Sequence, residues 1–380
     1  MPAFNTRIQQ ALAQRSEQGL SRSIRIIDDG NSALLKNGAA EYINFSSNDY
    51  LGLASDKSLT KAWQQGIDKY GNGSGASPLV TGFSSAHQQL EETLCDWLGF
   101  ERAILFSSGF SANQALLFSL LEKDDLLLQD KLNHASLMEA GMLSPAVMKR
   151  FRHNDVNHLA SLMNDNALVV TEGVFSMDGD MAPLADISAV TSEKGWLAVD
   201  DAHGIGVLGK QGQGSCAAAG IQPEILVVTF GKAFGLSGAA IMCSEQVGDY
   251  LTQFARHHVY STAIPPSQAV ALSHAASMIQ TQQWRRDKLE ELSEYYHHLL
   301  SDIEGYQTTD TPIKPFIIGS ADKAVAVAEQ LKSAGIWLTA IRPPTVPNGS
   351  ARLRITLTAE HQFHHIDKLA EQLKQAVKGE

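Results

Sequence analysis

Cysteine is scarce in this sequence, and positive charge is not in excess. The 380 residues include three cysteines, Cys95, Cys216 and Cys243, and no two of them have a CxxC spacing. An odd number without that spacing excludes a disulfide framework and a zinc motif, and it favours a reducing, cytoplasmic location. The formal net charge of −11 argues against binding to nucleic acid or to an anionic membrane, because both require a basic patch.

The chain also lacks a long uninterrupted hydrophobic run. Its first ten residues contain no apolar segment of the kind that a secretory signal needs. The most hydrophobic stretch, Leu226–Cys243, contains Lys232 and three glycines. Such a stretch is more typical of a strand, a turn and a second strand than of a membrane span. We therefore expect no association with a membrane.

Strand-like and helix-like segments alternate from about residue 58 to about residue 280. The expected strands are continuous apolar runs, which is typical of a parallel sheet covered on both faces. These strands are Ala103–Phe106, Asp125–Leu128, Val147–Phe151, Ala167–Glu172, Trp196–Asp200, Ile225–Phe230 and Ala239–Cys243. The expected helices include Ala86–Trp97, Ala112–Leu120, Ala135–Leu143 and Leu184–Glu193. The βαβα order predicts an α/β fold with a large, doubly wound, mostly parallel sheet.

The two ends of the chain have a different character. Residues 5–18 predict a polar amphipathic helix, and a short strand is expected at 42–45. Pro266–Ile303 predicts one long helix or two in tandem. The later elements, which indicate a smaller C-terminal α+β domain, are Pro315–Ile318, Asp322–Ser333, Ile336–Ile341, Arg352–Leu357 and His364–Val377. We expect an N-terminal helix-and-strand segment at 1–45, a large domain at 46–280 and a small domain at 281–380.

Lys232 lies at the end of the apolar run Ile225–Phe230, in the segment Thr229-Phe-Gly-Lys232. Burial there disfavours the charged form of a lysine. A neutral, desolvated amine is the form that makes a Schiff base with an aldehyde cofactor. Lys232 is therefore a candidate for the lysine of a pyridoxal 5'-phosphate (PLP) enzyme.

A second apolar run, Trp196–Val199, ends in Asp200-Asp-Ala-His203. An aspartate that pairs with a pyridinium nitrogen is the other protein group on which PLP chemistry depends. Asp200 could fill that role, and His203 could bond the phenolic oxygen of the cofactor. The alternative is a metal pair, but no third ligand follows at a helical or loop spacing, so we expect no metal.

Three further loops follow expected strands. Ser107-Ser-Gly109-Phe110 opens a helix, so it is either a phosphate-binding turn or an ordinary capped turn, and Lys232 favours the first. His134 could stack on a flat ring, although a lone histidine is more often structural. The loop around Ser176 lacks the full spacing of a calcium site, so we prefer a cofactor-facing loop. Carboxyl ends of strands are where open α/β sheets place ligands.

Two arginines lie on a late strand of the small domain. Arg352 and Arg354 share one face by periodicity, opposite Leu353 and Ile355. Arginine binds carboxylates through a two-pronged fork, so either side chain could hold a substrate. A dinucleotide site at Tyr70–Gly75 is not favoured, because this segment follows a helix-like stretch and lacks the full GxGxxG spacing. ATP and serine-hydrolase functions are not favoured either, because Gly231-Lys232-Ala233 lacks the Ser/Thr of a Walker A loop and GxSxG is absent.

Taken together, these segments resemble the α-oxoamine synthases, a family of fold-type I PLP-dependent transferases. The resemblance runs from about residue 40 to the C-terminus. Its marks are Asn44–Leu53, Gly73–Gly82, Asn133–Ser136, Val199–Gly204, Thr229–Lys232, Ala340–Pro347 and Arg352–Ala359.

The resemblance implies the following roles. Lys232 carries the cofactor, Asp200 pairs with the pyridinium nitrogen, His203 pairs with the phenolic oxygen, and His134 stacks on the ring. Around them, further PLP contacts come from Gly109, Phe110, Ser176, Thr229 and, across a homodimer interface, Thr262. Arg354 matches the arginine that binds the amino-acid carboxylate. Other substrate positions are Arg22, Asn48, His134 and Thr345.

The resemblance also implies a reaction. Ala340–Pro347 is most typical of members that condense L-alanine with a pimeloyl thioester, of coenzyme A or of a carrier protein, with loss of CO₂, in biotin biosynthesis. The alternative is condensation of glycine with acetyl-CoA, as in a glycine C-acetyltransferase.

Overall fold

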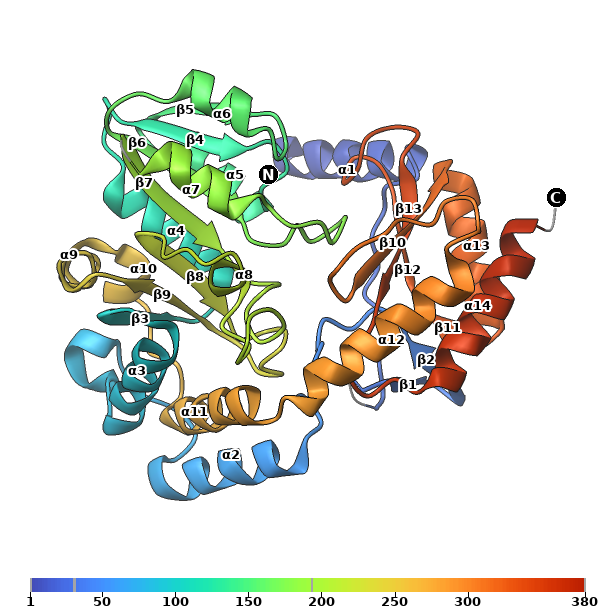
Figure 1. Ribbon diagram of the computed structural model, residues 1–380, viewed down its shortest axis with the longest axis horizontal. Coiled ribbons are helices and arrows are strands. Elements are labelled where there is room, and N and C mark those ends of the chain that lie inside the picture. The colour runs from blue at the N-terminus through green and yellow to red at the C-terminus, as the bar shows by residue number, and fades with distance from the viewer. Residues whose placement is uncertain (1, 30–31, 193, 379–380) are drawn as a thin grey trace.

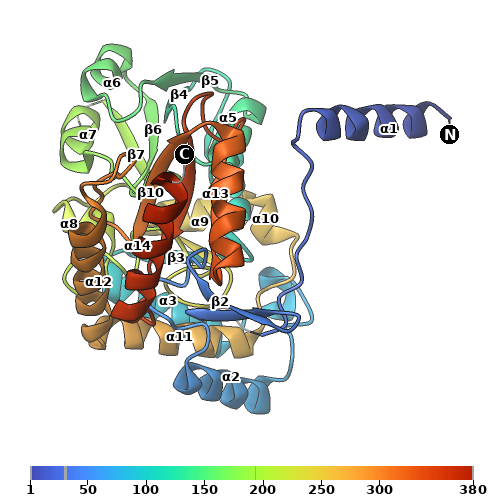
Figure 2. The same ribbon diagram turned by 90° about the vertical axis from the view of Figure 1, so that its right-hand side faces the viewer.

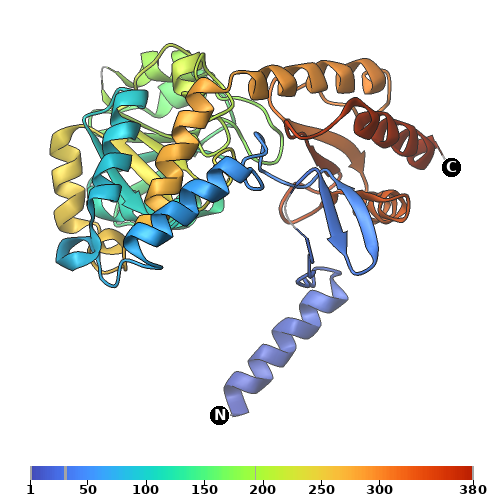
Figure 3. The same cartoon turned by 90° about the horizontal axis from the view of Figure 1, so that it is seen from below.

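The computed structural model describes residues 2–29, 32–192 and 194–378. Figure 1 shows two bodies, one built around a large sheet and the other from the C-terminal elements, with helix α12 (Trp284–Leu300) leading from the first to the second. Helix α1 (Pro2–Glu17) and the extended residues after it project away from both bodies in Figures 2 and 3. Residues 3–17 of this helix are all exposed, so its apolar positions are not buried by the described chain.

The large body is built on a seven-stranded sheet in the order β3-β9-β8-β7-β6-β4-β5. Pairings from β5 to β8 are parallel, and β9 runs antiparallel to both of its neighbours. These strands are β3 (Arg102–Phe106), β4 (Leu126–Asp130), β5 (Val147–Phe151), β6 (Ala167–Glu172), β7 (Gly195–Asp200), β8 (Ile225–Thr229) and β9 (Ala239–Cys243). The expected mostly parallel sheet is confirmed.

Helices cover both faces of this sheet. One core packs side chains of the sheet against α3, α6, α7 and α11, and the other packs them against α4, α5 and α9. The helices of the large body are α2 (Lys57–Tyr70), α3 (Ser85–Leu98), α4 (Gly109–Leu120), α5 (Ala135–Leu143), α6 (Val156–Leu162), α7 (Leu184–Thr191), α8 (Ser215–Ala218), α9 (Glu245–Phe254), α10 (Arg256–Val259) and α11 (Pro266–Thr281), with a π-helical turn at Pro78–Gly82. The expected end of one helix, Glu193, lies outside the described residues.

Local sequence explains where several elements begin and end. Helix α4 begins at Gly109, three residues before the expected Ala112, because the Ser108 side chain accepts a hydrogen bond from the Ser111 backbone N–H at 3.1 Å. Helix α2 packs against α11 so closely that a Cβ on Gly66 would lie 2.8 Å from the Ser267 Cα. Glycine at position 66 therefore permits the two backbones to approach.

The second body contains two small sheets and three helices. One sheet has the order β1-β2-β11 and the other β10-β13-β12. Helices α13 and α14 pack beside α12 and these sheets. The elements are β1 (Leu34–Asn37), β2 (Ala40–Asn44), β10 (Ile313–Gly319), α13 (Ala321–Ser333), β11 (Ile336–Trp337), β12 (Thr339–Ile341), β13 (Ala351–Thr356) and α14 (Phe363–Lys378).

One expectation changes in this region. The single strand expected at Ile336–Ile341 is wrong, because the chain changes sheets there: β11 pairs with β2, and β12 pairs with β13. The stretch Pro266–Ile303 forms two helices in tandem, α11 and α12, which confirms the second of the two arrangements expected for it. Among the described residues, no helix has the length and hydropathy that a membrane crossing requires.

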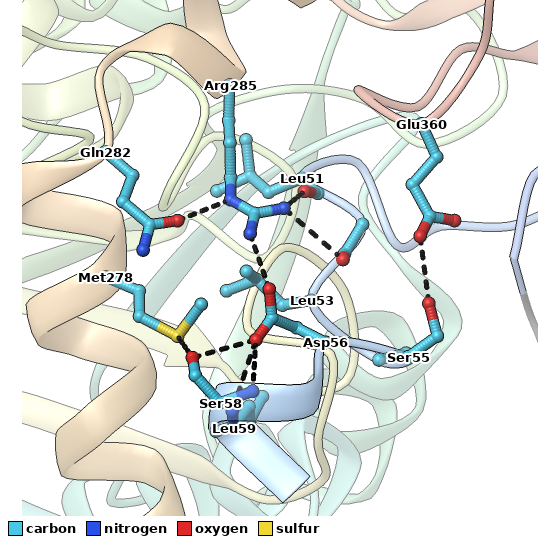
Figure 4. Close-up of polar contacts among 12 residues, drawn as sticks. Leu51, Leu53, Ser55, Asp56, Ser58, Leu59, Met278, Gln282, Arg285 and Glu360 are labelled. Carbon is cyan, nitrogen blue, oxygen red and sulfur yellow. Dashed lines mark hydrogen bonds and ion pairs between the residues drawn. The ribbon is translucent and has the colours of Figure 1, made fainter.

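Arg285, at the start of α12, links this helix to the loop that precedes α2. Its Nη1 donates to the Leu51 carbonyl at 2.7 Å, and its Nη2 contacts an Asp56 carboxylate oxygen at 2.8 Å (Figure 4). Asp56 also caps α2 through the Ser58 and Leu59 N–H groups. On the other side of this loop, Ser55 donates to Glu360 at 2.9 Å. The loop at 46–56 is therefore held by groups from both bodies.

Replacing Arg285 with alanine should lower the free energy of unfolding by about 3 kcal/mol, because the substitution removes one partner of a largely buried ion pair. The control is Lys36→Ala, since Lys36 pairs with Asp29 where both side chains are more than half exposed. That loss should stay below about 1 kcal/mol. Urea unfolding of both variants measures the difference, and equal losses would contradict a stabilising role for Arg285.

Candidate active site

A cavity of about 260 Å³ lies at the carboxyl ends of strands β6, β7 and β8. The expected cofactor residues that line it are Gly109, Phe110, His134, Asp200, His203, Thr229 and Lys232. These residues come from four separate segments of the chain. The parallel sheet brings them together because the loops after parallel strands leave at the same edge.

Lys232 follows β8 and faces the cavity. Its Nζ donates a hydrogen bond to Thr229 Oγ1 at 3.4 Å. Burial lowers the pKa of the Lys232 amine, while the neighbouring Asp200 and Glu172 carboxyl groups act in the opposite direction. The side chain thus has the environment that the sequence predicted for it, an amine that gives up its proton more easily than an exposed lysine.

Asp200 ends β7 and is buried, with 5% of its surface exposed. Its Oδ2 accepts a hydrogen bond from Asn113 Nδ2 at 2.7 Å, and its Oδ1 accepts one from the Ala202 backbone N–H at 3.0 Å. Both carboxylate oxygens therefore have a hydrogen-bond donor within the described chain. Asp200 is positioned to place a negative charge at the cavity wall.

His203 is buried three residues further along. Its Nδ1 pairs with the Tyr50 hydroxyl at 2.6 Å. Burial holds the pKa of His203 well below its usual value, and the positive charges of Lys232 and Arg354 lower it further. His203 is therefore a neutral imidazole, able to donate or accept one hydrogen bond at the cavity.

His134 caps helix α5 from its exposed position at the cavity mouth. Its Nδ1 accepts from the Ser136 backbone N–H at 3.2 Å and pairs with Ser136 Oγ at 2.8 Å. Its ring meets the edge of Phe110, with 6.5 Å between ring centroids. Desolvation of the ring lowers the pKa of His134, with the charge of Lys232 acting in the same direction and that of Asp200 in the opposite one. The cap and the aromatic contact fix the plane of the ring.

The start of α4 forms one wall. A Cβ on Gly109 would lie 2.6 Å from Thr229 Cγ2, so only glycine lets the helix reach this close to β8. The first backbone N–H groups of a helix have no partner within it and favour an anion. Thr229 and the N-terminus of α4 are thus side by side, which fits a phosphate group.

The small body contributes the arginines of β13. Arg354 donates from Nε to the Ser176 carbonyl at 2.6 Å and from Nη1 to Asn48 Oδ1 at 3.0 Å. Arg352 instead pairs with Asp178. Both side chains reach the loop that follows β6, so the predicted shared face is turned towards the large body.

A second cavity, of about 500 Å³, adjoins this loop. Ser176, Thr345 and Arg352 line it together with the apolar side chains Phe175, Ile317 and Val346. Ser176 therefore lies beside the second cavity, and its carbonyl is bonded to Arg354. Two other expected residues, Arg22 and Thr262, are exposed and do not line either cavity.

Sequence reasoning missed four residues at the first cavity or behind it, namely Tyr50, Asn113, Ser136 and Glu172. Glu172 carried a signal, because it ends the apolar run of β6 just as Asp200 ends that of β7. Tyr50 and Asn113 carried none, since their contacts come from distant parts of the chain. Ser136 carried none beyond its place two residues after His134.

Two buried polar atoms at the first cavity lack a partner among the described residues, Asn113 Oδ1 and Glu172 Oε1. Unpaired buried polar atoms are costly and indicate a missing ligand or water. A lysine amine, a buried carboxylate and a helix N-terminus beside them match the aldehyde, ring nitrogen and phosphate of PLP. The residues present therefore fit that cofactor.

His153 fastens the loop that carries Ser176. Its Nδ1 lies 3.0 Å from Asp130 and its Nε2 lies 2.7 Å from Asp180. Burial opposes a charge on this ring, but the two carboxylates outweigh burial and raise the pKa of His153 to about 10. A histidine whose pKa is raised in the folded state stabilises the fold fully below its unfolded value, about 6.5, and loses that effect as the pH rises towards 10.

The variant His153→Gln should lower the free energy of unfolding by about 2 kcal/mol at pH 6, because it removes charged hydrogen bonds. The deficit should shrink as the pH approaches 10. Urea unfolding at pH 6, 8 and 10 measures it, with the exposed His298→Gln as the control. A deficit that stays constant across this range would show that His153 is not charged by its two carboxylates.

Comparison with known proteins identifies relatives along nearly the whole chain. The family model for aminotransferase class I and II matches residues 40–373. An 8-amino-7-oxononanoate synthase from Vibrio atlanticus is 67% identical, over 99% of this chain and 94% of its own. The crystal structure of 8-amino-7-oxononanoate synthase from Francisella tularensis is 33% identical, with a TM-score of 0.80, over 89% and 98% of the two chains.

A serine palmitoyltransferase from S. paucimobilis, solved with bound PLP-myriocin, is similar over 100% of this chain and 98% of its own. Its sequence identity is 25% and its TM-score is 0.91. The fold is thus shared with relatives that differ in their substrates, while the most similar sequences share one enzyme name.

Proposed function

The chain belongs to the class I and II aminotransferase family, among its 8-amino-7-oxononanoate synthases, and from this premise we propose which residues perform the reaction. The synthase joins the Cα of L-alanine to the carbonyl carbon of a pimeloyl thioester. The alanine carboxyl leaves as CO₂ and the thiol is released, giving 8-amino-7-oxononanoate for biotin synthesis. The glycine and acetyl-CoA alternative is not favoured by the names of the most similar relatives.

The observation that carries this proposal is the pairing of Lys232 and Asp200 across one small cavity, at the ends of neighbouring strands. PLP, when bound, supplies an aldehyde that condenses with an amine and a ring that withdraws electrons from the adjacent carbon. Lys232 would hold this cofactor, and Asp200 would pair with its ring nitrogen. The remaining contacts are assigned to His134, His203, Thr229, Ser176 and the N–H groups of Gly109 and Phe110.

Proton transfer belongs to Lys232. Burial lowers the pKa of its amine, so the neutral form that accepts a proton is more accessible than in an exposed lysine. Lys232 removes the proton from the alanine Cα and returns a proton to the same carbon after CO₂ has left. The neutral His203 does not compete for that proton, since burial holds its pKa well below the usual value.

Substrate recognition is assigned to the loops between the bodies. Arg354 binds the alanine carboxylate, and Asn48, which accepts a hydrogen bond from Arg354, keeps the guanidinium in place. The cavity of about 500 Å³ beside Thr345 takes the acyl chain, because apolar side chains form much of its lining. Arg22 contacts the acyl donor, which is pimeloyl-CoA or a pimeloyl-carrier protein.

We also propose a homodimer in the cytoplasm. Thr262 is exposed and lies outside the cavity of its own chain, so its phosphate contact would be made in the partner subunit. Two exposed apolar side chains are Tyr260 (79% exposed), two residues before Thr262, and Val80 (73% exposed), in the π-helical turn that contacts α10. The three cysteines are free, which suits a reducing compartment.

A three-part division of the chain suits this function. We propose the segment 1–45, the large domain 46–280 and the small domain 281–380. Strand β2 of the first segment pairs with β11 of the last, so these two parts move as one. The site then lies where the large domain meets this unit, and closure of the two would bring Arg354 onto the substrate.

Product analysis tests the proposal. Purified protein with PLP, L-alanine and pimeloyl-CoA should give 8-amino-7-oxononanoate by mass spectrometry, and glycine with acetyl-CoA should give little product. The Lys232→Ala variant should lose at least about 10³-fold in turnover, because it loses both the cofactor anchor and the base. Exposed Lys210→Ala is the control. Substantial turnover by Lys232→Ala would overturn the assignment of this lysine.

A further inference from the structure

Two carboxyl groups lie next to each other at the wall of the active-site cavity. Glu172 ends β6 and Asp200 ends β7, and the two residues are register partners on neighbouring parallel strands. Register partners place their side chains on the same face of a sheet. Both side chains are buried, with 3% and 5% of their surface exposed, and both line the cavity.

The two carboxyl groups have unequal sets of hydrogen-bond donors. Asp200 receives hydrogen bonds on both oxygens, from Asn113 and from the Ala202 backbone. Glu172 is reached by the backbone N–H of His134, and its Oε1 is buried without any partner among the described residues. Asp200 is therefore satisfied on both oxygens by the described chain, whereas Glu172 is not.

The surroundings of Glu172 favour its protonated form. Burial raises its pKa well above the usual value, and the negative charges of Asp200 on β7 and Asp130 on β4 add to that effect. Lys232 after β8 and the His134 N–H before α5 act in the opposite direction but do not reverse it. Two adjacent buried carboxyl groups do not both ionise readily, and the pair therefore divides into one acid and one anion.

We propose that Glu172 keeps its proton on Oε1 and acts as a positioning residue, a neutral acid that donates a hydrogen bond into the cavity and leaves Asp200 as the anion facing Lys232. This inference relies on the proposed function only for the identity of the ligand in the cavity. The protonation of Glu172 itself follows from the described chain and is measurable without any substrate.

The proton on Glu172 predicts a dependence of stability on pH. A carboxyl group with a raised pKa in the folded state supports the fold fully below its unfolded pKa, about 4.3, and loses that support as the pH rises towards the folded value. Glutamine keeps the shape of the protonated acid but cannot lose a proton. The Glu172→Gln variant should therefore gain stability relative to the original chain as the pH rises.

The experiment is thermal unfolding of the full-length chain, as purified and after removal of PLP, from pH 6 to pH 9. The Tm of Glu172→Gln minus that of the original chain should rise by about 1–2 °C per pH unit. The control, Glu304→Gln, makes the same charge change at an exposed position and should give a constant difference. A constant difference for Glu172→Gln would overturn the proposal.

Kinetics and spectra separate a neutral donor from an ionised base. Glu172→Gln should keep the absorption band of bound PLP and keep kcat within about threefold, whereas Glu172→Ala should lose about tenfold in kcat, the value of one hydrogen bond. If Gln is as damaging as Ala, Glu172 acts as an anion and the proposal is wrong. The activity of Lys232→Ala tests the proposed function itself. Failure of the proposed function can therefore be told apart from failure of the proposal about Glu172.

If the Glu172 variants do not fold, the protonation of Glu172 can still be measured directly in the original chain. Glutamate labelled with ¹³C at Cδ in the original chain reports each carboxyl group by NMR. A second glutamate, the partly buried Glu91, whose pKa desolvation raises to about 8, is assigned by its own Glu91→Gln variant. The Glu172 resonance should remain at the protonated position at pH 7. A chemical shift typical of an ionised carboxylate at that pH would contradict the proposal.

Discussion

The active site depends on one electrostatic constraint: a small, buried cavity has to hold a lysine amine next to a single negative charge. Strands β6, β7 and β8 each end in or near a polar residue at the same edge of the sheet, so Glu172, Asp200 and Lys232 meet there. In a site with little water, charges interact strongly and excess charge is expensive. The donors around Asp200, the unpaired oxygen of Glu172 and the lowered pKa of Lys232 are all consequences of that constraint.

The second requirement is that the small body reaches this cavity. Strand β13 carries Arg354 to the Ser176 carbonyl and Arg352 to Asp178. His153 contacts Asp180 of the same loop, so residues of both bodies hold the loop after β6. Arg285 and Glu360 hold the loop at 46–56, which also carries Asn48 and Tyr50. Substrate recognition and the joint between the two bodies therefore use the same loops, and a change in either one affects the other.

The sequence predicted the sheet well because the strands buried on both faces are continuous apolar runs, such as Ile225–Thr229. It also predicted the charged residues that follow them, since a lysine or aspartate at the end of such a run is conspicuous. It could not predict register, so the pairing of Glu172 with Asp200 and the hydrogen bond from Asn113 went unrecognised. The change of sheets at Leu338 is likewise set by distant partners. The roles of Arg22 and Thr262 remain predictions, because their side chains meet nothing at the site within one chain.

The most direct test is to find which lysine binds the cofactor. The protein is loaded with PLP, reduced with borohydride, digested and analysed by peptide mass spectrometry. The account predicts a single pyridoxyl group, on Lys232. Lys314 is the informative competitor, since it too is buried and burial lowers its pKa to about 8, but it lies outside the active-site cavity. A label on Lys314, or none on Lys232, would contradict the account.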